Sequence, residues 1–298
     1  MKRFAAIFAF LALSPTLGAG AETPAAGTFA LQGGAPHAAA YLLAPQNGTN
    51  RLDRHLDAWM TPIGSTTEII RSYQIDMTKY LHMIAISDDF RTFLHVHPTL
   101  EADGHFLLDQ AFPAPARYHI YIDAQPENFG QQVFRFDEDF GGPANRGPRD
   151  LSETGTVAAA GPYAVSISSN SLSSQSESKI VVHITKNGKP ASDLHPYLGA
   201  LAHAVFINAD DLSYVHAHPM PLPSGTGGAP MAMDSMPMDS MTMDSGEMAM
   251  PSPLPDSATS SPDMLLHVAL REPGTYKLWL QFRGGSTLYV APFVLTAR

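Results

Sequence analysis

The feature that most constrains the fold is a long pattern that occurs twice in the chain. The first copy spans residues 81–98 and the second spans residues 202–219, and they align without a gap at an offset of 121. Each copy contains a histidine, twelve further residues and then the motif His-x-His-Pro. The match resumes downstream, where residues 116–122 align with residues 274–280 at an offset of 158. The chain is therefore a tandem duplication, and we expect both copies to adopt the same fold.

Short runs of β-branched and aromatic residues are bounded by turn residues in both copies, as at Asn187-Gly188 and Gly284-Gly285 in the second. This pattern predicts an all-β chain of two tandem immunoglobulin- or cupredoxin-like antiparallel β-sandwich domains, related by duplication. The expected strands of the first copy cover residues 68–75, 81–87, 91–97, 105–112, 117–123 and 133–136. Those of the second copy cover residues 163–168, 179–185, 202–208, 213–218, 264–271, 276–282 and 287–295.

Composition shifts along the chain suggest where these domains begin and end. The second offset exceeds the first by 158 − 121 = 37 residues, so an insertion of that size lies between Pro219 and Met264. Residues 22–60, which are rich in alanine and interrupted by proline, predict either a tail or an edge strand. The expected parts are a signal peptide (1–21), an N-terminal segment (22–60), a first sandwich (61–140), a linker (141–160) and a second sandwich (161–298) with a Met-rich loop (220–262).

The N-terminus has the three parts of a secretory signal peptide. Lys2 and Arg3 precede an apolar run from Phe4 to Leu13, and the small residues Ala19-Gly20-Ala21 predict cleavage after Ala21. The apolar run is too short to span a bilayer, and we expect no transmembrane segment in the mature chain. These features predict a bacterial protein that is periplasmic or secreted. The formal net charge of −10 argues against a nucleic-acid partner.

The repeated histidines are predicted to meet on one face of a hairpin in each copy. If the strands flank a turn at Asp88-Asp89, paired residue numbers sum to 177 in the first copy and to 419 in the second. Because side chains alternate along a strand, this register places His82 opposite His95 with His97 on the same face. The six candidate metal ligands form a first triad (His82, His95 and His97) and a second triad (His203, His216 and His218). The prolines that follow the motifs predict that each triad lies at a rim of its sandwich.

Imidazole binds Cu(II), Zn(II), Ni(II) and Fe(II), so the triads alone do not identify the metal. The alternative for the triads is a hydrogen-bonded edge of the core, since Ile84, Ile86 and Phe93 share their face. The remaining histidines show no comparable spacing and are expected to be structural or solvated. They are His37, His55, His105, His119, His183, His195 and His267.

Methionine is concentrated in the insertion, where eight of the 14 methionines fall within residues 231–250. The candidate soft-metal ligands are Met231, Met233, Met236, Met238, Met241, Met243, Met248 and Met250. The chain has no cysteine, which excludes thiolate sites, and thioether sulfur selects Cu(I) among biological metals. Low-complexity drift, an adaptable docking surface and an oxidant sink are the alternatives for this segment.

The motif Asp193-Leu194-His195-Pro196-Tyr197-Leu198-Gly199-Ala200, followed by a strand and a hairpin ending in His-x-His-Pro, resembles a family of bacterial secreted proteins associated with copper. The expected sandwich is also similar to those of small periplasmic copper-resistance proteins and YtkA-like domains. The resemblance covers residues 161–219 and 264–296 best and residues 66–136 less closely. It implies an exported, copper-linked β-sandwich without established catalysis.

The leading hypothesis is a periplasmic protein that sequesters or delivers copper, with Cu(II) on the triads and Cu(I) on the methionines. Its partners would be a copper exporter, an oxidase or another periplasmic copper protein. The main alternative is a zinc or iron metalloenzyme, either a hydrolase or a cupin-like oxygenase, because His95-x-His97 followed by Glu101 is similar to a cupin ligand set. Leu222 takes the place of that glutamate in the second copy. A third hypothesis is a structural adhesion or assembly module without metal.

Overall fold

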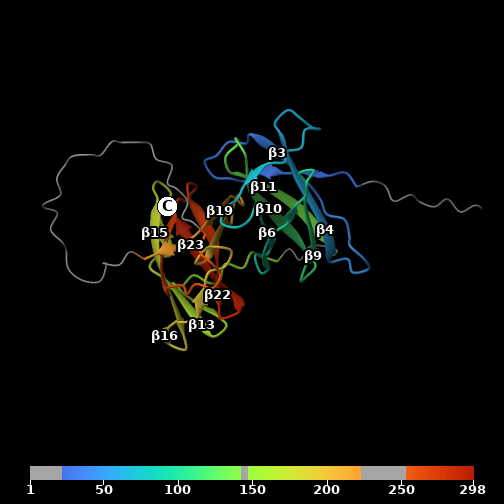
Figure 1. The fold of residues 1–298 in the computed structure, drawn as a ribbon. Coiled ribbons are helices and arrows are strands. Elements are labelled where there is room, and N and C mark those ends of the chain that lie inside the picture. The colour runs from blue at the N-terminus through green and yellow to red at the C-terminus, as the bar shows by residue number, and fades with distance from the viewer. Residues whose placement is uncertain (1–21, 142–146, 223–252) are drawn as a thin grey trace, which may run out of the picture.

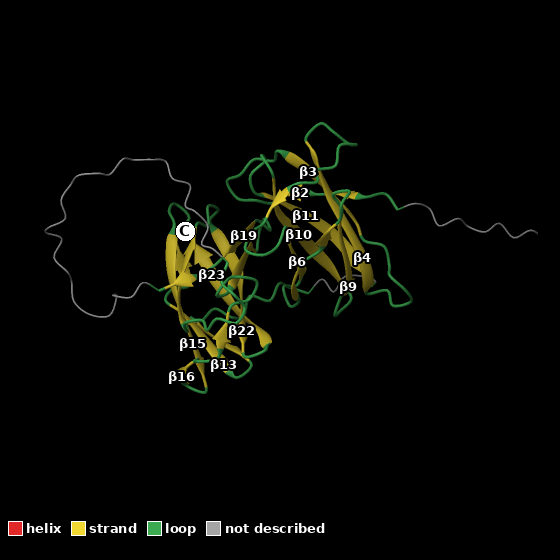
Figure 2. Ribbon diagram, viewed as in Figure 1, coloured by secondary structure: helices red, strands yellow, loops and turns green. Residues whose placement is uncertain are grey.

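The computed structural model describes residues 22–141, 147–222 and 253–298. These residues form strands, turns and loops but no helix, and the strands belong to four sheets (Figure 2). The prediction of an all-β chain with two tandem sandwiches is therefore confirmed. In the described part of the chain, nothing has the helical length and apolar character that a membrane crossing requires.

Two sheets form the first sandwich. The outer sheet has the order β1-β3-β4-β9-β8, with β1 Ala25–Ala26, β3 Ala38–Leu43, β4 Asp53–Pro62, β9 Phe106–Ala111 and β8 Thr99–Leu100. The inner sheet has the order β2-β11-β10-β6-β7, with β2 Thr28–Phe29, β11 Gln132–Phe140, β10 Ala116–Pro126, β6 Leu81–Ser87 and β7 Phe93–Val96. The short β5, Tyr73–Gln74, pairs with the end of β10.

The second sandwich repeats this arrangement. Its outer sheet has the order β12-β13-β15-β21-β20, with β12 Val157–Ala160, β13 Tyr163–Ile167, β15 Ser178–Lys186, β21 Asp263–Val268 and β20 Met220–Pro221. Its inner sheet has the order β14-β23-β22-β18-β19, with β14 Ser171–Leu172, β23 Thr287–Ala297, β22 Gly274–Gly284, β18 His203–Asn208 and β19 Tyr214–Ala217. The short β16, Lys189–Pro190, pairs with β15, and β17, Leu194–His195, pairs with β22.

Both faces of each inner sheet are covered. On β6, the odd-numbered Leu81, Met83 and Ala85 point into the core of the first sandwich. The even-numbered Ile84 and Ile86 point the other way, into a third apolar cluster that contains residues of both sandwiches. Every residue of β6 and of β18 is consequently buried, although a strand that faces water on one side would alternate.

The third cluster is the interface between the sandwiches, which meet between β6 and β10 on one side and β19 and β22 on the other (Figure 1). Two aromatic stacks cross it. Tyr121 stacks on Tyr214 with ring centroids 5.1 Å apart, and Trp279 stacks on Phe93 at 5.3 Å. The offsets of 158 and 121 map Tyr121 onto Trp279 and Phe93 onto Tyr214, so the two stacks are equivalent. The duplicated halves thus pack about an approximate two-fold axis, as the subunits of a symmetric dimer do.

The structure differs from the expected boundary of the first sandwich at residue 61. All of β3 and most of β4 precede that residue, and they lie in the middle of the outer sheet. Their side chains alternate between buried and partly exposed positions along most of each strand. The alternation is hard to recognise in the sequence because β3 uses alanine, which rarely marks a strand, and β4 is charged at Asp53, Arg54 and Asp57.

All the other expected strands but one are confirmed to within four residues at each end, and the strand 81–87 is confirmed without a difference. The exception is the segment 68–75, of which only Tyr73–Gln74 pairs as a strand. The expected linker 141–160 also ends earlier than predicted, because Val157–Ala160 pairs with β13. The part of the linker that the structure describes is tied to both halves: the Asp150 amide donates to the Asp89 carbonyl (2.8 Å), and Lys277 forms an ion pair with Glu153.

Candidate metal centre

Each triad is carried by a hairpin whose register differs from the predicted one by two residues. In the first copy Ile84 pairs with His95, and in the second Val205 pairs with His216, so paired numbers sum to 179 and 421. The prediction that His82 lies directly opposite His95 is wrong, because in the observed register His82 lies opposite His97. A shift of two residues preserves the alternation of side chains, however, and the three histidines of each copy still share one face.

The register shift comes from the length of the turn. Ser87 Oγ donates to Asp89 Oδ1 (2.6 Å), and the Arg91 amide donates to the same oxygen (3.2 Å). Phe90 adopts a left-handed conformation with φ of 59°, and the Ser87 amide donates to the Thr92 carbonyl (3.1 Å). The turn therefore has four residues instead of two, since the carboxylate organises the backbone around it.

In the first triad, three ring nitrogens converge on one point. His82 Nδ1 lies 3.1 Å from His95 Nε2 and 3.2 Å from His97 Nε2, and the latter two nitrogens are 3.2 Å apart. The outer nitrogens face hydrogen-bond acceptors. His82 Nε2 faces the backbone oxygen of Asp76 (3.4 Å), and His95 Nδ1 faces Oε1 of Gln281 in the other sandwich (3.0 Å). These acceptors assign the protons to the outer nitrogens of His82 and His95, so their inner nitrogens carry lone pairs.

The second triad repeats this geometry. His203 Nδ1 lies 3.2 Å from His216 Nε2 and 3.1 Å from His218 Nε2. The outer Nε2 of His203 donates to the backbone oxygen of Tyr197 (3.0 Å), and the outer Nδ1 of His216 lies 3.7 Å from Oδ2 of Asp123 in the other sandwich. Each triad is thus oriented in part by a side chain of the opposite half.

Lone pairs that face one another at 3.1 Å repel unless a proton or a cation lies between them. A tetrahedral ion whose ligands are about 3.2 Å apart sits about 1.9–2.0 Å from each, which is close to the metal–imidazole distance of about 2.0–2.1 Å. Three such nitrogens leave a fourth position open. The buried histidine groups can therefore hold metal ions, as the structure also indicates by bringing ligand atoms of His82, His95, His203 and His216 within 4.8 Å of one another.

Burial keeps these imidazoles neutral. Loss of hydration lowers the pKa of all six histidines below the usual value, and repulsion from neighbouring imidazoles adds to this for all but His82. The pKa of His97 and that of His218 fall to about 3. Neutral imidazole is the form that binds metal, so at neutral pH the triads need lose no proton to do so.

Two carboxylates near the triads were not among the candidates from sequence. Asp76 offers an oxygen within 4.8 Å of ligand nitrogens of His216 and His218, although it belongs to the first sandwich. Asp123 is buried beside His216 and accepts hydrogen bonds from Tyr214 (3.0 Å) and Gln131 (2.9 Å). Burial raises the pKa of Asp123 to about 7 and also raises that of Asp76.

A sequence signal for both carboxylates exists in the duplication. The offset of 121 aligns Asp76 with Tyr197. The backbone oxygen of Asp76 faces Nε2 of His82, and the backbone oxygen of Tyr197 faces Nε2 of His203 in the same way. The offset of 158 aligns Asp123 with Gln281, one position beyond the stretch that matches. Positions that are structurally equivalent but chemically different therefore distinguish the two triads.

The other histidines lie away from the triads and have partners of their own. Five face a carboxylate: His55 faces Asp109, His105 faces Asp57, His119 faces Asp137 and Asp88, His183 faces Asp263, and His267 faces Glu177. His37 and His195 face backbone carbonyls. Glu101, the residue that suggested a cupin-like set, is exposed in the turn between β8 and β9. All eight methionines of residues 231–250 lie outside the described residues.

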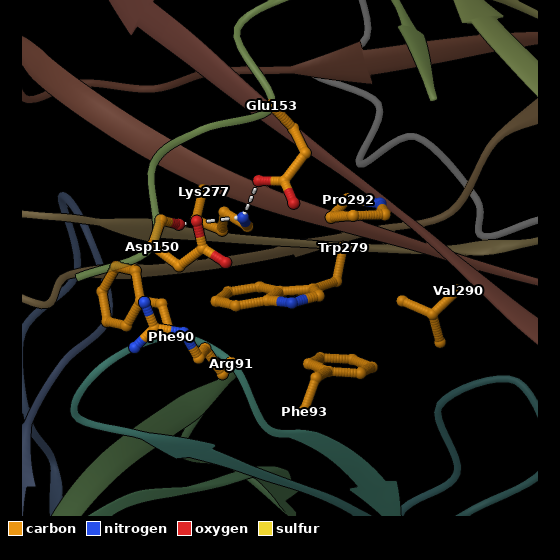
Figure 3. A pocket seen from close by; sticks show the side chains of 9 residues that line it. All are labelled: Phe90, Arg91, Phe93, Asp150, Glu153, Lys277, Trp279, Val290 and Pro292. Carbon is orange, nitrogen blue, oxygen red and sulfur yellow. Dashed lines mark hydrogen bonds and ion pairs between the residues drawn. The ribbon is translucent and has the colours of Figure 1, made fainter. Parts of the chain in front are cut away.

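A hollow of about 300 Å³ opens at the edge of the interface, on the side of the linker (Figure 3). In Figure 3 the ring of Trp279 lies over that of Phe93, and Lys277 is bonded to Glu153 and to the backbone of Asp150. The triads do not line it. Phe93 and Trp279, whose stacked rings form one wall, lie two residues from His95 on β7 and two residues from Gln281 on β22, respectively. Because His95 and Gln281 are in contact, this wall helps to hold the first triad in place.

Comparison with known families gives one match. The model of a family described as Domain of unknown function (DUF8832) matches residues 60–137 and 157–298. Each matched range contains one triad. No protein with curated annotation matches the chain.

Proposed function

We propose that this chain, which belongs to the DUF8832 family, is a copper-binding protein of the bacterial cell envelope that sequesters the metal or delivers it to another protein. Cu(II) would bind the two triads, and Cu(I) would bind the methionines of residues 231–250. A copper exporter, an oxidase or another periplasmic copper protein would be its partner. The N-terminal pattern of residues 1–21 supports export.

The observation that carries this proposal is the convergence of three neutral ring nitrogens, 3.1–3.2 Å apart, in the first triad and the matching contacts in the second. Groups that merely completed a hydrogen-bonded edge of the core would alternate donors with acceptors. Here the outer nitrogens of His82 and His95 donate to a backbone carbonyl and to Gln281, which leaves their inner nitrogens facing each other as two acceptors.

The choice of copper rests on ligand chemistry. Among divalent first-row metals, nitrogen sites bind Cu(II) most tightly. Eight thioethers in residues 231–250 add a ligand that selects Cu(I), and the absence of cysteine leaves imidazole and thioether as the nitrogen and sulfur ligands of the chain. A chain that offers ligands for both oxidation states suits a compartment where copper is found in both.

Metal titration of the purified protein tests the proposal. We expect Cu(II) to bind in preference to Zn(II), and we expect His97→Ala and His218→Ala, which alter the less buried member of each triad, to weaken that binding. His183→Ala is the matched control, because His183 is half-buried, pairs with Asp263 and lies outside both triads. Absence of copper binding, or equal binding by the triad variants and the control, would refute the proposal.

A second candidate is a His-ligated zinc or iron enzyme. The observation in its favour is the tetrahedral spacing of three nitrogens, which leaves room for a metal-bound water as in catalytic zinc sites. This candidate predicts that Zn(II) or Fe(II) outcompetes copper and that hydrolase or oxygenase activity is lost in His97→Ala.

A further inference from the structure

The two triads lie against each other across the interface between the sandwiches. The ring centroids of His82 and His216 are 5.0 Å apart, and those of His95 and His203 are 4.9 Å apart. The approximate two-fold axis relates these two contacts, because His82 is equivalent to His203 and His95 to His216. One ring nitrogen from each of these four histidines lies within 4.8 Å of the other three.

We propose that the six histidines form a single two-metal centre, in which two copper ions lie close enough to share one small bridging anion such as hydroxide. The proposal rests on the function proposed above and adds the nuclearity of the site and the chemical class of its exogenous ligand. Its scaffold is the interface: each half contributes one triad, and neither half contains the whole centre.

The spacing of the nitrogens fits two ions. In two-metal sites the ions are about 3.5–4 Å apart, and each lies about 2 Å from its own nitrogens, so nitrogens of opposite sets are about 4–6 Å apart. The upper limit of 4.8 Å between ligand nitrogens of the four histidines is compatible with this range. A single shared ion would leave one nitrogen in each triad, on His97 and on His218, without a metal.

The buried charges also fit a bridged pair. Cations in a buried site need compensating charge, and two carboxylates lie beside the triads. Asp123 lies beside His216, and Asp76 lies beside His82 of the first triad as well as His216 and His218 of the second. Oδ1 of Asp76 is buried and has no hydrogen-bond partner among the described residues, which leaves it free to face a cation. The positive charge of two Cu(I) ions is balanced by the negative charge of these two carboxylates, whereas two Cu(II) ions carry two further positive charges. We therefore expect the oxidised centre to bind small anions, which balance its excess positive charge.

The two halves of the centre differ in affinity. Asp76 lies near both triads, since its Oδ2 is 3.7 Å from His82 Nε2 and its carboxylate also approaches His216 and His218. The difference comes from the group behind the second histidine of each triad: the neutral amide of Gln281 lies behind His95, whereas the carboxylate of Asp123 lies behind His216. Changes in the groups that orient metal ligands alter affinity by about 10–100-fold. We expect the first Cu(II) to occupy the second triad and the second Cu(II) to bind at least about tenfold more weakly at the first triad.

Electron paramagnetic resonance of the purified protein, titrated with Cu(II) without reductant, tests this inference. One equivalent gives the full signal of an isolated Cu(II). The second equivalent lowers the integrated signal per copper well below that of isolated ions, because neighbouring spins couple. In the optical spectrum of the same sample, added azide produces a new charge-transfer band by entering the bridge. His97→Ala binds one copper with an undiminished isolated signal, and His183→Ala behaves as the wild type.

The wild-type titration decides the matter even if a variant fails to fold. Two bound Cu(II) ions with the full signal of two isolated spins would mean that the triads act separately, which overturns the two-metal centre and leaves copper binding intact. Saturation at one copper per chain would mean a shared single ion and would also overturn it. Failure to bind any copper would instead refute the proposed function.

Discussion

Trp279 offers a way to disturb the interface without touching a ligand. Its ring is 3% exposed and stacks on Phe93 of the other sandwich at 5.3 Å with an interplanar angle of 12°. Replacing a buried tryptophan by alanine removes its packing and leaves a cavity, at a cost of about 3–5 kcal/mol. We expect Trp279→Ala to lower the free energy of unfolding by this amount, because the side chain packs within the third apolar cluster.

Phe293→Ala is the matched control. Phe293 lies on the neighbouring strand β23 and is fully buried, but it points into the core of the second sandwich and away from the interface. Urea unfolding should show a similar loss of stability in both variants, since both remove a buried aromatic ring. Only Trp279→Ala should also separate the triads, so that two bound Cu(II) ions regain the signal of isolated spins.

Two results would contradict this reasoning. Wild-type stability in Trp279→Ala would mean that the ring is not buried between the sandwiches in solution. An equal loss of spin coupling in Phe293→Ala would mean that general destabilisation, and not the interface, controls the geometry of the centre.

Three further predictions concern stability and the methionines. The lowered pKa values of the triad histidines mean that, below pH 6.5, the metal-free folded protein binds fewer protons than the unfolded chain. The free energy of unfolding therefore decreases as the pH falls, by up to about 1.4 kcal/mol per pH unit for each such histidine. Urea midpoints at pH 7.5 and 5.5 measure this, and equal midpoints would contradict it. Asp89→Ala removes the acceptor that organises the turn and should cost about 1–3 kcal/mol in urea unfolding, whereas no loss would show that the backbone alone sets the register. Replacing the eight methionines of residues 231–250 by leucine should weaken Cu(I) binding in competition with a Cu(I) chelator and leave Cu(II) binding at the triads unchanged.

The hairpins and the composition of the triads could be predicted from sequence because both depend on local periodicity. Alternation places His82, His95 and His97 on one face whenever the register shifts by an even number of residues. The error of two residues in turn length therefore did not change the predicted membership of the triad. The error arose because Asp88-Asp89 resembles a two-residue turn, while the hydrogen bonds of the Asp89 carboxylate close a four-residue one.

The meeting of the triads could not be predicted in the same way, because it depends on which face of each sheet the other sandwich covers. One signal was present: Ile84 and Ile86 share the face of His82, which is unusual for a face exposed to water. That signal predicts burial without naming the covering partner. The approach of Asp76 and Asp123 to the second triad is equally non-local, since each meets histidines of that triad that lie more than 90 residues away in the chain.

The duplication explains why the centre can be asymmetric. Two identical subunits packed about a two-fold axis would place the same residue behind both triads. Because the halves are joined in one chain, equivalent positions have diverged: Asp76 corresponds to Tyr197, and Asp123 corresponds to Gln281. Both carboxylates belong to the first sandwich, but Asp123 faces His216 of the second triad, whereas Asp76 lies near His82 of the first triad and near His216 and His218 of the second. The substitution Asp123→Gln should therefore bring the affinities of the two triads for Cu(II) closer together, and a stepwise titration that still shows the original difference would exclude Asp123 as its source.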